Sequence, residues 1–438
     1  PYQYYATEAI IERVKNSNKN GYIWHTTGSG KTLTSFKTSQ ILRKLPEVKK
    51  VLFVVDRKDL DYQTQKEFDS FEKWSVDATD NTKKLVEQLA GDDTLIITTL
   101  QKLNNAIFKD SYKSQIEHLR DEKIVFIFDE CHRSQFGETH NRIKGFFDNA
   151  QMFWFTWTPI LAKNHSNKRT TADLFEKCLH QYVITDAIKD ENVLKFSIEY
   201  INTFKTKKEF EEDGDIDVAG INTREVFENP ERLEKVADYI LKNHNAKTHS
   251  RSFTAMFCVS NIDMLIAYYE LFKRKDHNLK IATIFSYKAN EEDKDADGNL
   301  DDEDIAVPAG QENKHSREKL DDFMEDYNEM FQTNYSTKDS KIFYNYYKDI
   351  AKRVKKKEID ILLVVNMFLT GFDSKSLNTL YVDKNLKYHG LIQAFSRTNR
   401  IMWQVKSQWN IVCFRNLKKA TDEAITLFSN WDAADTIV

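Results

Sequence analysis

The sequence GYIWHTTGSGKT, residues 21–32, decides the fold class of this chain. Its first four residues form a short apolar run that predicts a buried strand, and a helix reaching to about Leu45 is expected to follow. A strand, a glycine-rich turn and a helix in this order are typical of a phosphate-binding loop. Glycines let backbone N–H groups face the phosphates, and the N-terminus of the helix adds its dipole.

The residue types in this loop suit particular roles. We expect Lys31 to reach the terminal phosphates and Thr32 to hold Mg²⁺ through its hydroxyl. His25 stands where the standard pattern G-x-x-x-x-G-K-T has its first glycine. The alternative for the whole stretch is a glycine-rich turn that only caps a helix. The other nucleotide-binding candidates of the loop are Thr27, Gly28, Ser29 and Gly30.

A pair of carboxylates lies in the stretch FDECH, residues 128–132. Five apolar residues, 124–128, place Asp129 and Glu130 just past the end of a buried strand. Phosphoryl transfer needs a carboxylate on Mg²⁺ and a second group that orients or deprotonates water. Asp129 suits the first role and Glu130 the second, although such a pair can also simply cap the next helix. Its position about a hundred residues after a phosphate loop favours the catalytic interpretation.

Two arginines lie in QAFSRTNR, residues 393–400, a stretch expected to be helical. Arg397 and Arg400 are three residues apart and share a helix face, so on their own they read as surface arginines. In a two-lobed ATPase, the lobe opposite the phosphate loop needs planar, permanently charged donors for the γ-phosphate. Arg400 is the first choice for this arginine finger and Arg397 the second, with Gln393 as a further catalytic candidate. ATP would then bridge two lobes, and hydrolysis would release the bridge.

Short apolar runs alternate with helical stretches along the chain. Such runs, separated by long spacers, are typical of fully buried parallel strands in an α/β sheet. They occur at residues 21–24, 50–55, 94–98, 124–128, 151–156, 253–259, 280–285, 359–365, 379–382 and 410–414. We therefore predict an α/β chain with a first lobe at residues 1–180, a connector at 181–245 and a second lobe at 246–438. Ligands of such sheets gather beyond the carboxyl ends of the strands, where every motif falls.

Composition limits the class of protein. With 40% hydrophobic and 30% charged residues, the 438-residue chain can form sizeable cores. No apolar run approaches the roughly 18–20 residues of a membrane span, and the opening PYQYYATEAI is not a signal peptide, so we expect a cytoplasmic protein without membrane contact. The missing initiator Met suggests a fragment. Four scattered cysteines favour reduced, buried thiols over a zinc site: Cys131, Cys178, Cys258 and Cys413. The net charge of −4 does not by itself indicate a nucleic-acid-binding protein.

The motifs together resemble those of superfamily 2 helicases. HTTGSGKT looks like motif I, DECH like motif II, FLTGFD at residues 368–373 like motif V and QAFSRTNR like motif VI. The stretch 364–401, VVNMFLTGFDSKSLNTLYVDKNLKYHGLIQAFSRTNRI, is similar to the restriction subunits of type I restriction-modification enzymes. YNYYKDIAKRVKKKEIDILLVV before it and YVITDAIKDENVLKF in the connector share this likeness. The resemblance covers nearly the whole chain.

The resemblance implies two RecA-like lobes, each a mostly parallel sheet flanked by helices, with ATP in the cleft between them. Motors of this family use ATP and Mg²⁺ to move double-stranded DNA past the enzyme without separating its strands. Their partners are methyltransferase and specificity subunits, and a separate nuclease domain precedes the motor. Too few residues precede the phosphate loop here for a nuclease fold. We therefore expect a DNA-dependent ATPase that does not cut DNA alone.

Further site residues follow from matching positions. Gln3 resembles the glutamine that reads adenine upstream of motif I, and Gly371 and Asp373 of FLTGFD join the nucleotide site. Backbone amides and hydroxyls along the DNA track are implied to contact phosphates at Asp56, Arg57, Thr98, Thr99, Gln101, Val259, Ser260 and Thr370. For each of these positions, an ordinary helix cap or turn hydroxyl is the alternative.

The chain departs from the family in FWFTWTPI, residues 153–160, which matches motif III. Trp154 and Trp157 stand where the family typically has glycines, and a glycine in such a turn usually supplies a backbone conformation that a bulky side chain resists. The coupling of hydrolysis to lobe movement is therefore in question. The alternative is that the turn tolerates tryptophan and stacks it in the cleft between the lobes.

An acidic stretch interrupts the second lobe within residues 288–312. Nine of the fourteen residues in EEDKDADGNLDDED, residues 291–304, are acidic, which predicts a solvated loop that like charge keeps away from DNA. A calcium loop is the alternative, because its spacing is matched by Asp293, Asp295, Asp297, Gly298 and Asp304. Its terminal ligand would be Asp rather than Glu, which argues against calcium.

Three functions are compatible with this sequence. The leading one is ATP-dependent translocation on double-stranded DNA. The second is a strand-separating helicase or remodelling motor with the same engine. The third is a nucleotide-dependent DNA clamp with little turnover, an idea motivated by Trp157. DNA-stimulated ATP turnover distinguishes the motors from the clamp.

Overall fold

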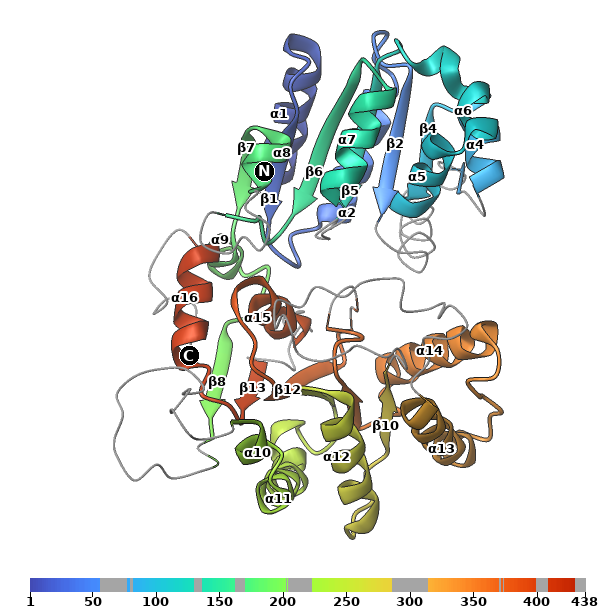
Figure 1. Ribbon diagram of the computed structural model, residues 1–438. Helices are drawn as coiled ribbons and strands as arrows, with labels where there is room; N and C mark the ends of the chain where they lie inside the picture. Colours follow the sequence, from blue (N-terminus) through green and yellow to red (C-terminus); the bar gives the residue numbers. More distant parts are fainter. Residues whose placement is uncertain are drawn as a thin grey trace. The chain divides into compact units, whose positions relative to one another are not determined.

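The computed structural model describes residues 1–55, 77–78, 82–129, 136–161, 170–201, 203, 223–285, 314–369, 372, 374–398 and 409–429. The chain divides into two compact units, Pro1–Ala187 and Ile188–Val438. Each unit is built around a parallel sheet flanked by helices, as expected for an α/β chain, and each is described by itself (Figure 1).

The first unit contains a seven-stranded sheet in the order β3-β4-β2-β5-β6-β1-β7, with every pair parallel. Its strands are β1 (Gly21–His25), β2 (Lys50–Val55), β3 (Asp77–Ala78), β4 (Leu95–Thr99), β5 (Ile124–Asp129), β6 (Ala150–Thr156) and β7 (Cys178–Tyr182). Its helices are α1 (Tyr2–Asn16), α2 (Lys31–Leu42), α4 (Thr82–Ala90), α5 (Leu100–Phe108), α6 (Asp110–Ile116), η1 (Glu117–Leu119), α7 (Phe136–Phe146) and α8 (Thr171–Phe175), with α9 (Ile184–Lys189) at the unit boundary.

Alternation along the central strands covers both faces of this sheet. Phe53, Ile127 and Phe153 point to the face where α1 and α2 pack, and they form one buried cluster with residues of those helices. The alternate residues of the same strands point to the opposite face, where the ring centroids of Phe126 and Phe147 lie 5.5 Å apart. Because both faces are buried, the strands read as continuous apolar runs.

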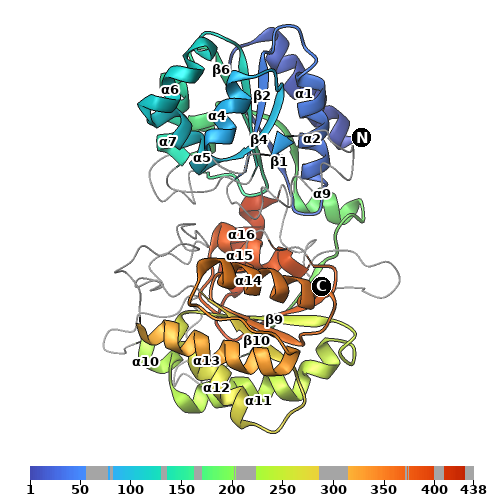
Figure 2. The ribbon, with the colours of Figure 1, turned by 90° about the vertical axis from the view of Figure 1, so that its right-hand side faces the viewer.

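The second unit contains a six-stranded sheet in the order β10-β11-β9-β12-β13-β8, again with every pair parallel. Its strands are β8 (Phe196–Tyr200), β9 (Thr254–Val259), β10 (Ile281–Ile284), β11 (Ile361–Val364), β12 (Leu377–Asp383) and β13 (Trp409–Cys413). Its helices are α10 (Thr223–Phe227), α11 (Pro230–Lys247), α12 (Ile262–Arg274), α13 (Lys314–Phe331), α14 (Ser340–Lys355), α15 (Tyr388–Phe395), η3 (Ser396–Thr398) and α16 (Lys418–Phe428). Within this unit, α11 and α12 cover one side of the sheet, and α14, α15 and α16 cover the other (Figures 1 and 2).

All ten predicted strands are present, within two residues at each end. The prediction missed β3, β7 and β8, which are three of the four end strands in the two strand orders. β7, CLHQY, and β8, FSIEY, are mostly half-buried, so they lack the continuous apolar run that identifies a strand buried on both faces.

The structure draws two boundaries differently from the sequence analysis. The expected connector, residues 181–245, contains β8 and most of α11, and β8 pairs with β13 in the second sheet, while the chain divides after Ala187. The expected helix across residues 393–400 ends at Phe395 and is followed by the 3₁₀ turn η3. The helix after the phosphate loop ends at Leu42, close to the expected Leu45. None of the described helices is both long and apolar enough to cross a membrane.

Candidate functional site

The turn between β1 and α2 has the backbone of a phosphate-binding loop. Gly28 and Gly30 have φ angles of 82° and 71°, in the left-handed region that favours glycine. A β-carbon built on Gly30 would lie 2.5 Å from Nε2 of Gln3, so a side chain there would strain the backbone and make Gln3 shift. The backbone N–H of Thr26 donates to the carbonyl of Tyr182 at 2.8 Å, which ties the start of the loop to β7. The two glycines therefore give the loop a backbone conformation that other residues would adopt only with strain.

The N-terminal helix brings Gln3 onto this loop. Nε2 of Gln3 donates to the carbonyl of Ser29 at 3.1 Å, and the hydroxyl of Tyr2 donates to the same carbonyl at 2.7 Å. The ring of Tyr2 also stacks on Tyr182 with centroids 3.7 Å apart. Gln3 and Tyr2, which are adjacent in α1, thus contact a loop residue that lies 26 and 27 positions later in the chain.

Lys31 begins α2 and lies against an aromatic ring. Its Nζ donates to the carbonyl of His25 at 3.4 Å and lies 5.5 Å from the ring centroid of Trp157. Trp157 is buried, and its carbonyl accepts from the indole N–H of Trp24 at 3.1 Å. A cation at this distance from an indole face is attracted by the ring quadrupole. The motif III tryptophan is therefore part of the phosphate-loop region.

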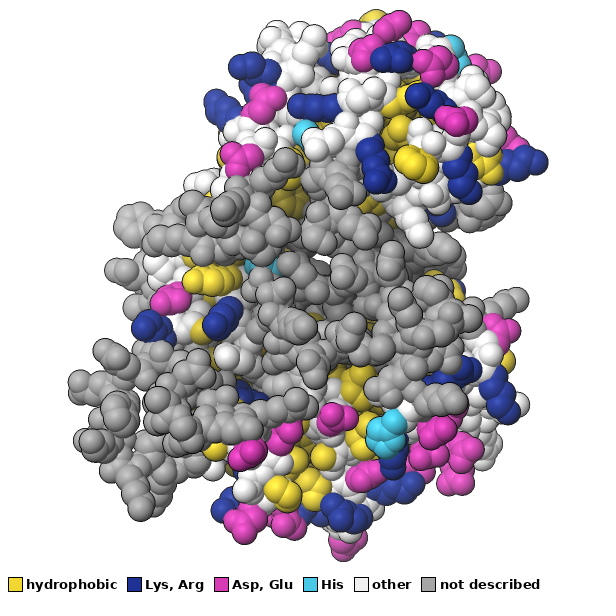
Figure 3. Space-filling model, in the orientation of Figure 1, with side chains coloured by type: hydrophobic (Ala, Val, Ile, Leu, Met, Phe, Trp, Pro, Cys, Tyr) yellow, Lys and Arg dark blue, Asp and Glu magenta, His cyan; other side chains and the backbone are white. Residues whose placement is uncertain are grey.

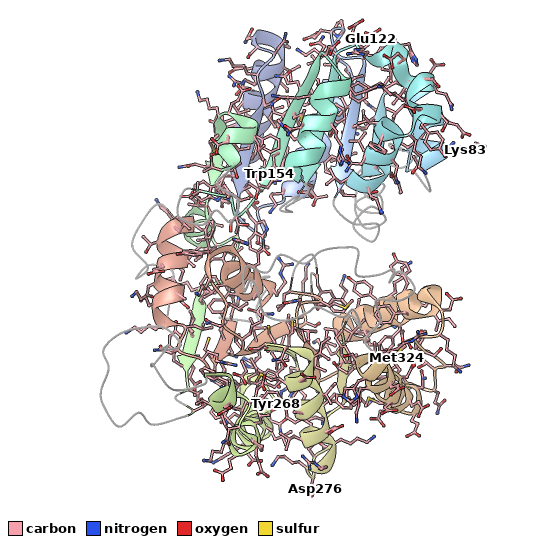
Figure 4. The ribbon with its side chains drawn as sticks, viewed as in Figure 1. Lys83, Glu122, Trp154, Tyr268, Asp276 and Met324 are labelled. Atoms are coloured by element: carbon pink, nitrogen blue, oxygen red, sulfur yellow. The ribbon has the colours of Figure 1, made fainter. Side chains whose placement is uncertain are left out.

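The two tryptophans of motif III fit without unusual backbone geometry. Neither Trp154 nor Trp157 has a positive φ, so this backbone does not require the glycines that the family has there. Trp154 is a residue of β6 and stacks on Phe175 of α8 with centroids 5.3 Å apart (Figure 4). The backbone of this turn therefore accommodates tryptophan, while stacking in the cleft between the lobes and the effect on coupling stay predictions.

His25 differs from the usual first glycine of the loop and is fully buried. Its Nε2 lies 2.9 Å from Nδ1 of His180 on β7, so the two rings share one hydrogen bond. Burial, with the nearby His180 and Lys31, lowers the pKa of His25 to about 3. His25 is therefore neutral at ordinary pH and leaves the positive charge of this region on Lys31.

Asp129 and Thr32 are the candidate Mg²⁺ ligands. Asp129 is the last residue of β5, and it pairs in register with Phe155 of β6. β1, β5 and β6 are parallel and end at the same edge of the sheet, where the loop also lies. Thr32 is in the first turn of α2 and is half-buried.

The residues present fit ATP and Mg²⁺. Two left-handed glycines open the loop backbone, and the hydroxyl oxygen of Thr27 is buried with no hydrogen-bond partner in the described part of the chain. Among the described residues, no group of three or more His, Cys, Asp or Glu side chains could hold a metal alone. Asp129 at the strand end is compatible with Mg²⁺, because this ion is commonly bound by one or two carboxylates together with substrate phosphates.

In the second unit, a buried ionic cluster surrounds Asp383 at the end of β12. Arg232 donates to both carboxylate oxygens at 2.9 and 2.7 Å, Arg415 donates to Oδ1 at 2.7 Å, and Tyr268 donates to Oδ2 at 2.6 Å. Burial by itself would raise the pKa of Asp383, but Arg415, Arg232 and Tyr268 outweigh it and hold the pKa below its usual value. Tyr268 reaches the cluster from α12 (Figure 4).

Sequence reasoning missed this Asp383 cluster, although part of it had a signal. Asp383 and Arg415 each follow a buried apolar run, and parallel strands end at one edge of a sheet. Arg232 carried no such signal, because it lies on a helix within the expected connector.

Two predicted DNA contacts of the second unit border the same cluster. Val259 is fully buried as the last residue of β9. Ser260 is also buried, and its hydroxyl donates to the carbonyl of Asp383 at 3.1 Å while Arg415 donates to it at 3.2 Å. The Ser260 side chain therefore serves the interior of the unit, which leaves the backbone as the group available for a ligand.

The predicted DNA residues after β4 lie in three different environments. Thr98 is buried in the strand. The hydroxyl of Thr99 accepts from the backbone N–H of Lys102 at 3.3 Å and caps α5, which is the alternative role considered for it. Gln101 is exposed on α5.

Gln393 and Arg397 are both buried near the end of α15. The guanidinium of Arg397 donates to the carbonyl of Gln393 at 3.2 Å and to the carbonyl of Phe372 at 2.8 Å. Arg397 is thus engaged inside its own unit and is not a surface arginine.

Several predicted positions lie outside the described residues. They are Asp56, Arg57, Glu130, Cys131, Thr370, Gly371, Asp373, Arg400 and the acidic stretch 288–312 with its calcium-like spacing. Among the described cysteines, Cys258 and Cys413 are buried and Cys178 is half-buried, and all three are free thiols.

Comparison with known proteins finds a family model for each half of the chain and relatives that span both halves. Residues 2–232 match the family of SWI2/SNF2 ATPases, and residues 251–416 match domain 3 of the type I restriction enzyme subunit R. The endonuclease subunit of the type I restriction enzyme SauMSSORF170P from Staphylococcus aureus is 51% identical over the whole chain, which covers 46% of that relative. The HindI endonuclease subunit of Haemophilus influenzae is 25% identical over 98% of the chain and 40% of its own length.

Solved structures agree on the fold. A fragment assigned to the HsdR subunit of a type I restriction enzyme from Vibrio vulnificus matches 100% of the chain and 67% of its own length, with a TM-score of 0.58 and 15% identity. The DNA-bound Type ISP restriction-modification enzyme LlaBIII matches 94% of the chain and 27% of its own length, with a TM-score of 0.54 and 14% identity. The chain spans a little under half the length of the S. aureus relative. It belongs to the SWI2/SNF2 ATPase family and carries domain 3 of a type I restriction enzyme subunit R.

Proposed function

We propose that this chain is the ATP-dependent motor region of a type I restriction enzyme and moves along double-stranded DNA while hydrolysing ATP to ADP and phosphate. The observation that carries the proposal is the phosphate loop. Its two left-handed glycines and Lys31 lie at the sheet edge where β5 ends with Asp129. The relatives are endonuclease subunits of type I restriction enzymes, and LlaBIII is ATP-dependent and was solved bound to DNA.

Each predicted nucleotide-site residue of the first unit has a role in this proposal. Gln3 contacts the adenine, and the loop amides with Lys31 hold the phosphates. Thr32 and Asp129 hold Mg²⁺, which when bound polarises the γ-phosphate and neutralises charge that develops on it. Glu130 orients the attacking water and accepts its proton.

The second unit supplies the cation that acts on the γ-phosphate. Arg400 is the favoured arginine finger, because Arg397 already donates to two carbonyls of its own unit. We assign Arg397 to positioning the segment around Phe372, next to Gly371 and Asp373, and Gln393 supports it through its carbonyl. In this scheme hydrolysis changes the contacts between the units and drives movement.

The DNA track uses sequence-independent contacts. Gln101 offers an exposed side chain, while Val259 and Ser260 offer backbone groups because their side chains are buried. Asp56, Arg57, Thr98, Thr99 and Thr370 complete the set as proposed. Methyltransferase and specificity subunits are the proposed partners, and the cytoplasm is the proposed location.

A DNA clamp with little turnover is the second candidate. The contact between Lys31 and Trp157 favours it, because an attraction to the ring competes with the phosphates for the lysine. A strand-separating motor shares the same engine, and a strand-displacement assay with a labelled duplex distinguishes it from a translocase.

Steady-state ATP hydrolysis with and without linear duplex DNA, at low and moderate salt, tests the proposal. A translocase should show duplex stimulation that fades as salt rises. Tight ATP binding without stimulation would instead support the clamp. Lys31→Ala should abolish turnover, and Lys37→Ala, which removes an exposed lysine of the same helix, serves as the matched control. Preserved turnover in Lys31→Ala would remove the phosphate-loop argument.

A further inference from the structure

One face of α14 concentrates positive charge in a chain whose net charge is −4. Tyr344, Lys348, Lys352 and Lys355 recur every three or four residues and therefore share a helix face, which we name the α14 basic face. The three lysines are exposed and Tyr344 is half-buried. Elsewhere, on the view in Figure 3, basic and acidic side chains of the described surface are interspersed.

Described carboxylates near Lys352 and Lys355 do not cancel the charge of these two lysines. Residues 348–357 contain six basic residues and one acidic residue, Asp349. Asp349 accepts from Arg353 at 2.8 Å and from Tyr327 at 2.8 Å, so it is neutralised on the side of the helix away from the lysines. Within the described ranges, no ion pair joins Lys352 or Lys355 to a carboxylate.

A ladder of aromatic rings lies beside the α14 basic face. Tyr344 and Tyr347 are stacked with centroids 6.3 Å apart, and Tyr347 stacks on Phe368 at 4.6 Å and 9°. Phe368 meets Phe372 edge-on at 4.7 Å. Nζ of Lys348 lies 4.2 Å from the Tyr344 centroid. The lysines and the rings therefore form one connected surface feature.

This ladder reaches the buried arginine of motif VI. Phe368 has a φ of 66°, a left-handed conformation that is strained for a bulky residue and persists only where neighbours hold it. The carbonyl of Phe372, the last ring, accepts from Arg397 at 2.8 Å. A continuous series of contacts thus joins the surface of α14 to Arg397.

We propose that the α14 basic face binds the backbone of double-stranded DNA and that the aromatic ladder communicates this binding to Arg397. The inference rests on the proposed motor function. Lysines from 348 to 355 span about 10 Å at 1.5 Å per residue, which matches about three phosphates at 3.4 Å per strand. The ring faces of Tyr347 and Phe368 are stacked on each other, so they are poorly placed to receive unpaired bases.

Binding of the full chain to duplex DNA across a salt series tests the first half of the proposal. The triple variant Lys348→Ala, Lys352→Ala, Lys355→Ala should bind at least about tenfold more weakly at low salt, and its slope of log affinity against log salt should be shallower by about 2.7, or 0.9 for each phosphate. The matched control replaces three other exposed lysines of the same unit, Lys235, Lys418 and Lys419, by alanine.

The outcomes separate this inference from the proposed function. Equal weakening by the two triple variants would mean a general charge effect and would overturn the α14 basic face as a site. Weakening confined to single-stranded DNA would overturn the duplex as its ligand. If the unsubstituted chain neither binds duplex nor is stimulated by it, the proposed motor function fails instead.

Tyr347 tests the second half of the proposal as a positioning residue. Tyr347→Leu removes a ring from the ladder, so the ratio of duplex-stimulated to basal ATP hydrolysis should fall about fivefold or more while duplex affinity stays within twofold. Tyr347→Phe keeps the ring and should restore the ratio. An unchanged ratio in Tyr347→Leu, or a phenylalanine that fails to rescue it, would overturn communication through the ladder.

Discussion

Replacing Asp383 by asparagine should destabilise the second unit by several kcal/mol. The side chain is fully buried and accepts four hydrogen bonds, two from Arg232, one from Arg415 and one from Tyr268. Asparagine keeps the volume but removes the negative charge and turns an N–H group toward a guanidinium. Two buried arginines then lose the anion that compensates their burial.

The magnitude follows from the cost of breaking a buried ion pair. Removing one partner costs about 3–5 kcal/mol, because the other charge is left uncompensated in a medium of low dielectric constant. Arg232 also keeps the carbonyls of Phe227 and Phe414 as acceptors, at 3.0 and 2.8 Å, so we expect about 4 kcal/mol rather than more. For a unit of this size, that corresponds to a fall in Tm of about 8–16 °C.

Hydrogen–deuterium exchange in a urea series measures this change unit by unit. Peptides of β12 and β13 should lose protection in the variant, while peptides of β1 and β6 in the first unit serve as the internal control. Asp148→Asn is the matched variant, because Asp148 is exposed and accepts from the exposed Arg120 at 3.0 Å. It should leave both units nearly unchanged.

The pH dependence gives a second check. The folded pKa of Asp383 is lowered, so its stabilising effect is complete above the unfolded pKa of about 4 and is lost as the pH falls through the folded value. The stability difference between Asp383→Asn and the unsubstituted chain should therefore be constant near neutral pH and shrink below about pH 4. A difference below about 1 kcal/mol at pH 7, or one that grows on acidification, would refute the reasoning.

Three further predictions concern the nucleotide site. Gly30→Ala should weaken nucleotide binding in a calorimetric titration, because its φ of 71° strains any residue with a side chain. Gly145→Ala, on an open helix surface, should bind normally. Normal binding by the first variant would contradict the observed loop geometry. Trp157→Leu should lower the Kd for ATP two- to fivefold, because it removes about 0.5–1 kcal/mol of attraction between Lys31 and the ring, which competes with the phosphates. Weaker ATP binding by a folded variant would exclude that competition. Glu130→Gln should retain ATP binding while single-turnover hydrolysis slows by about 10²-fold or more, and a collapse of binding would rule out the water-activating role.

The sequence predicted the strands that are buried on both faces and missed those that are not. β2, KVLFVV, and β5, IVFIFD, are apolar almost throughout because each is covered by helices on both sides. β7 and β8 lie at the ends of their sheets and carry polar residues at half-buried positions, so no apolar run identifies them. For the same reason the connector was drawn across β8, although that strand belongs to the second sheet.

The candidate site divides along similar lines. Residues 25–32 and 128–132 are short local motifs, and their chemistry can be recognised from residue type and order alone. The contact of Lys31 with Trp157 joins residues 126 positions apart, and the ion pair of Arg232 with Asp383 joins residues 151 positions apart. No local pattern specifies such pairs, because they depend on which strands become neighbours.

The sequence by itself therefore determined the α/β class, the phosphate loop with its carboxylate partner, and the family resemblance. Only the tertiary structure decided which side chains those motifs leave available. It buried Ser260 and Arg397 in contacts of their own unit, placed Trp157 against Lys31, and aligned the rings of α14 with Phe368. The physical reason is that periodicity and turn chemistry act over a few residues, whereas burial and hydrogen-bond partners are set when distant segments pack together.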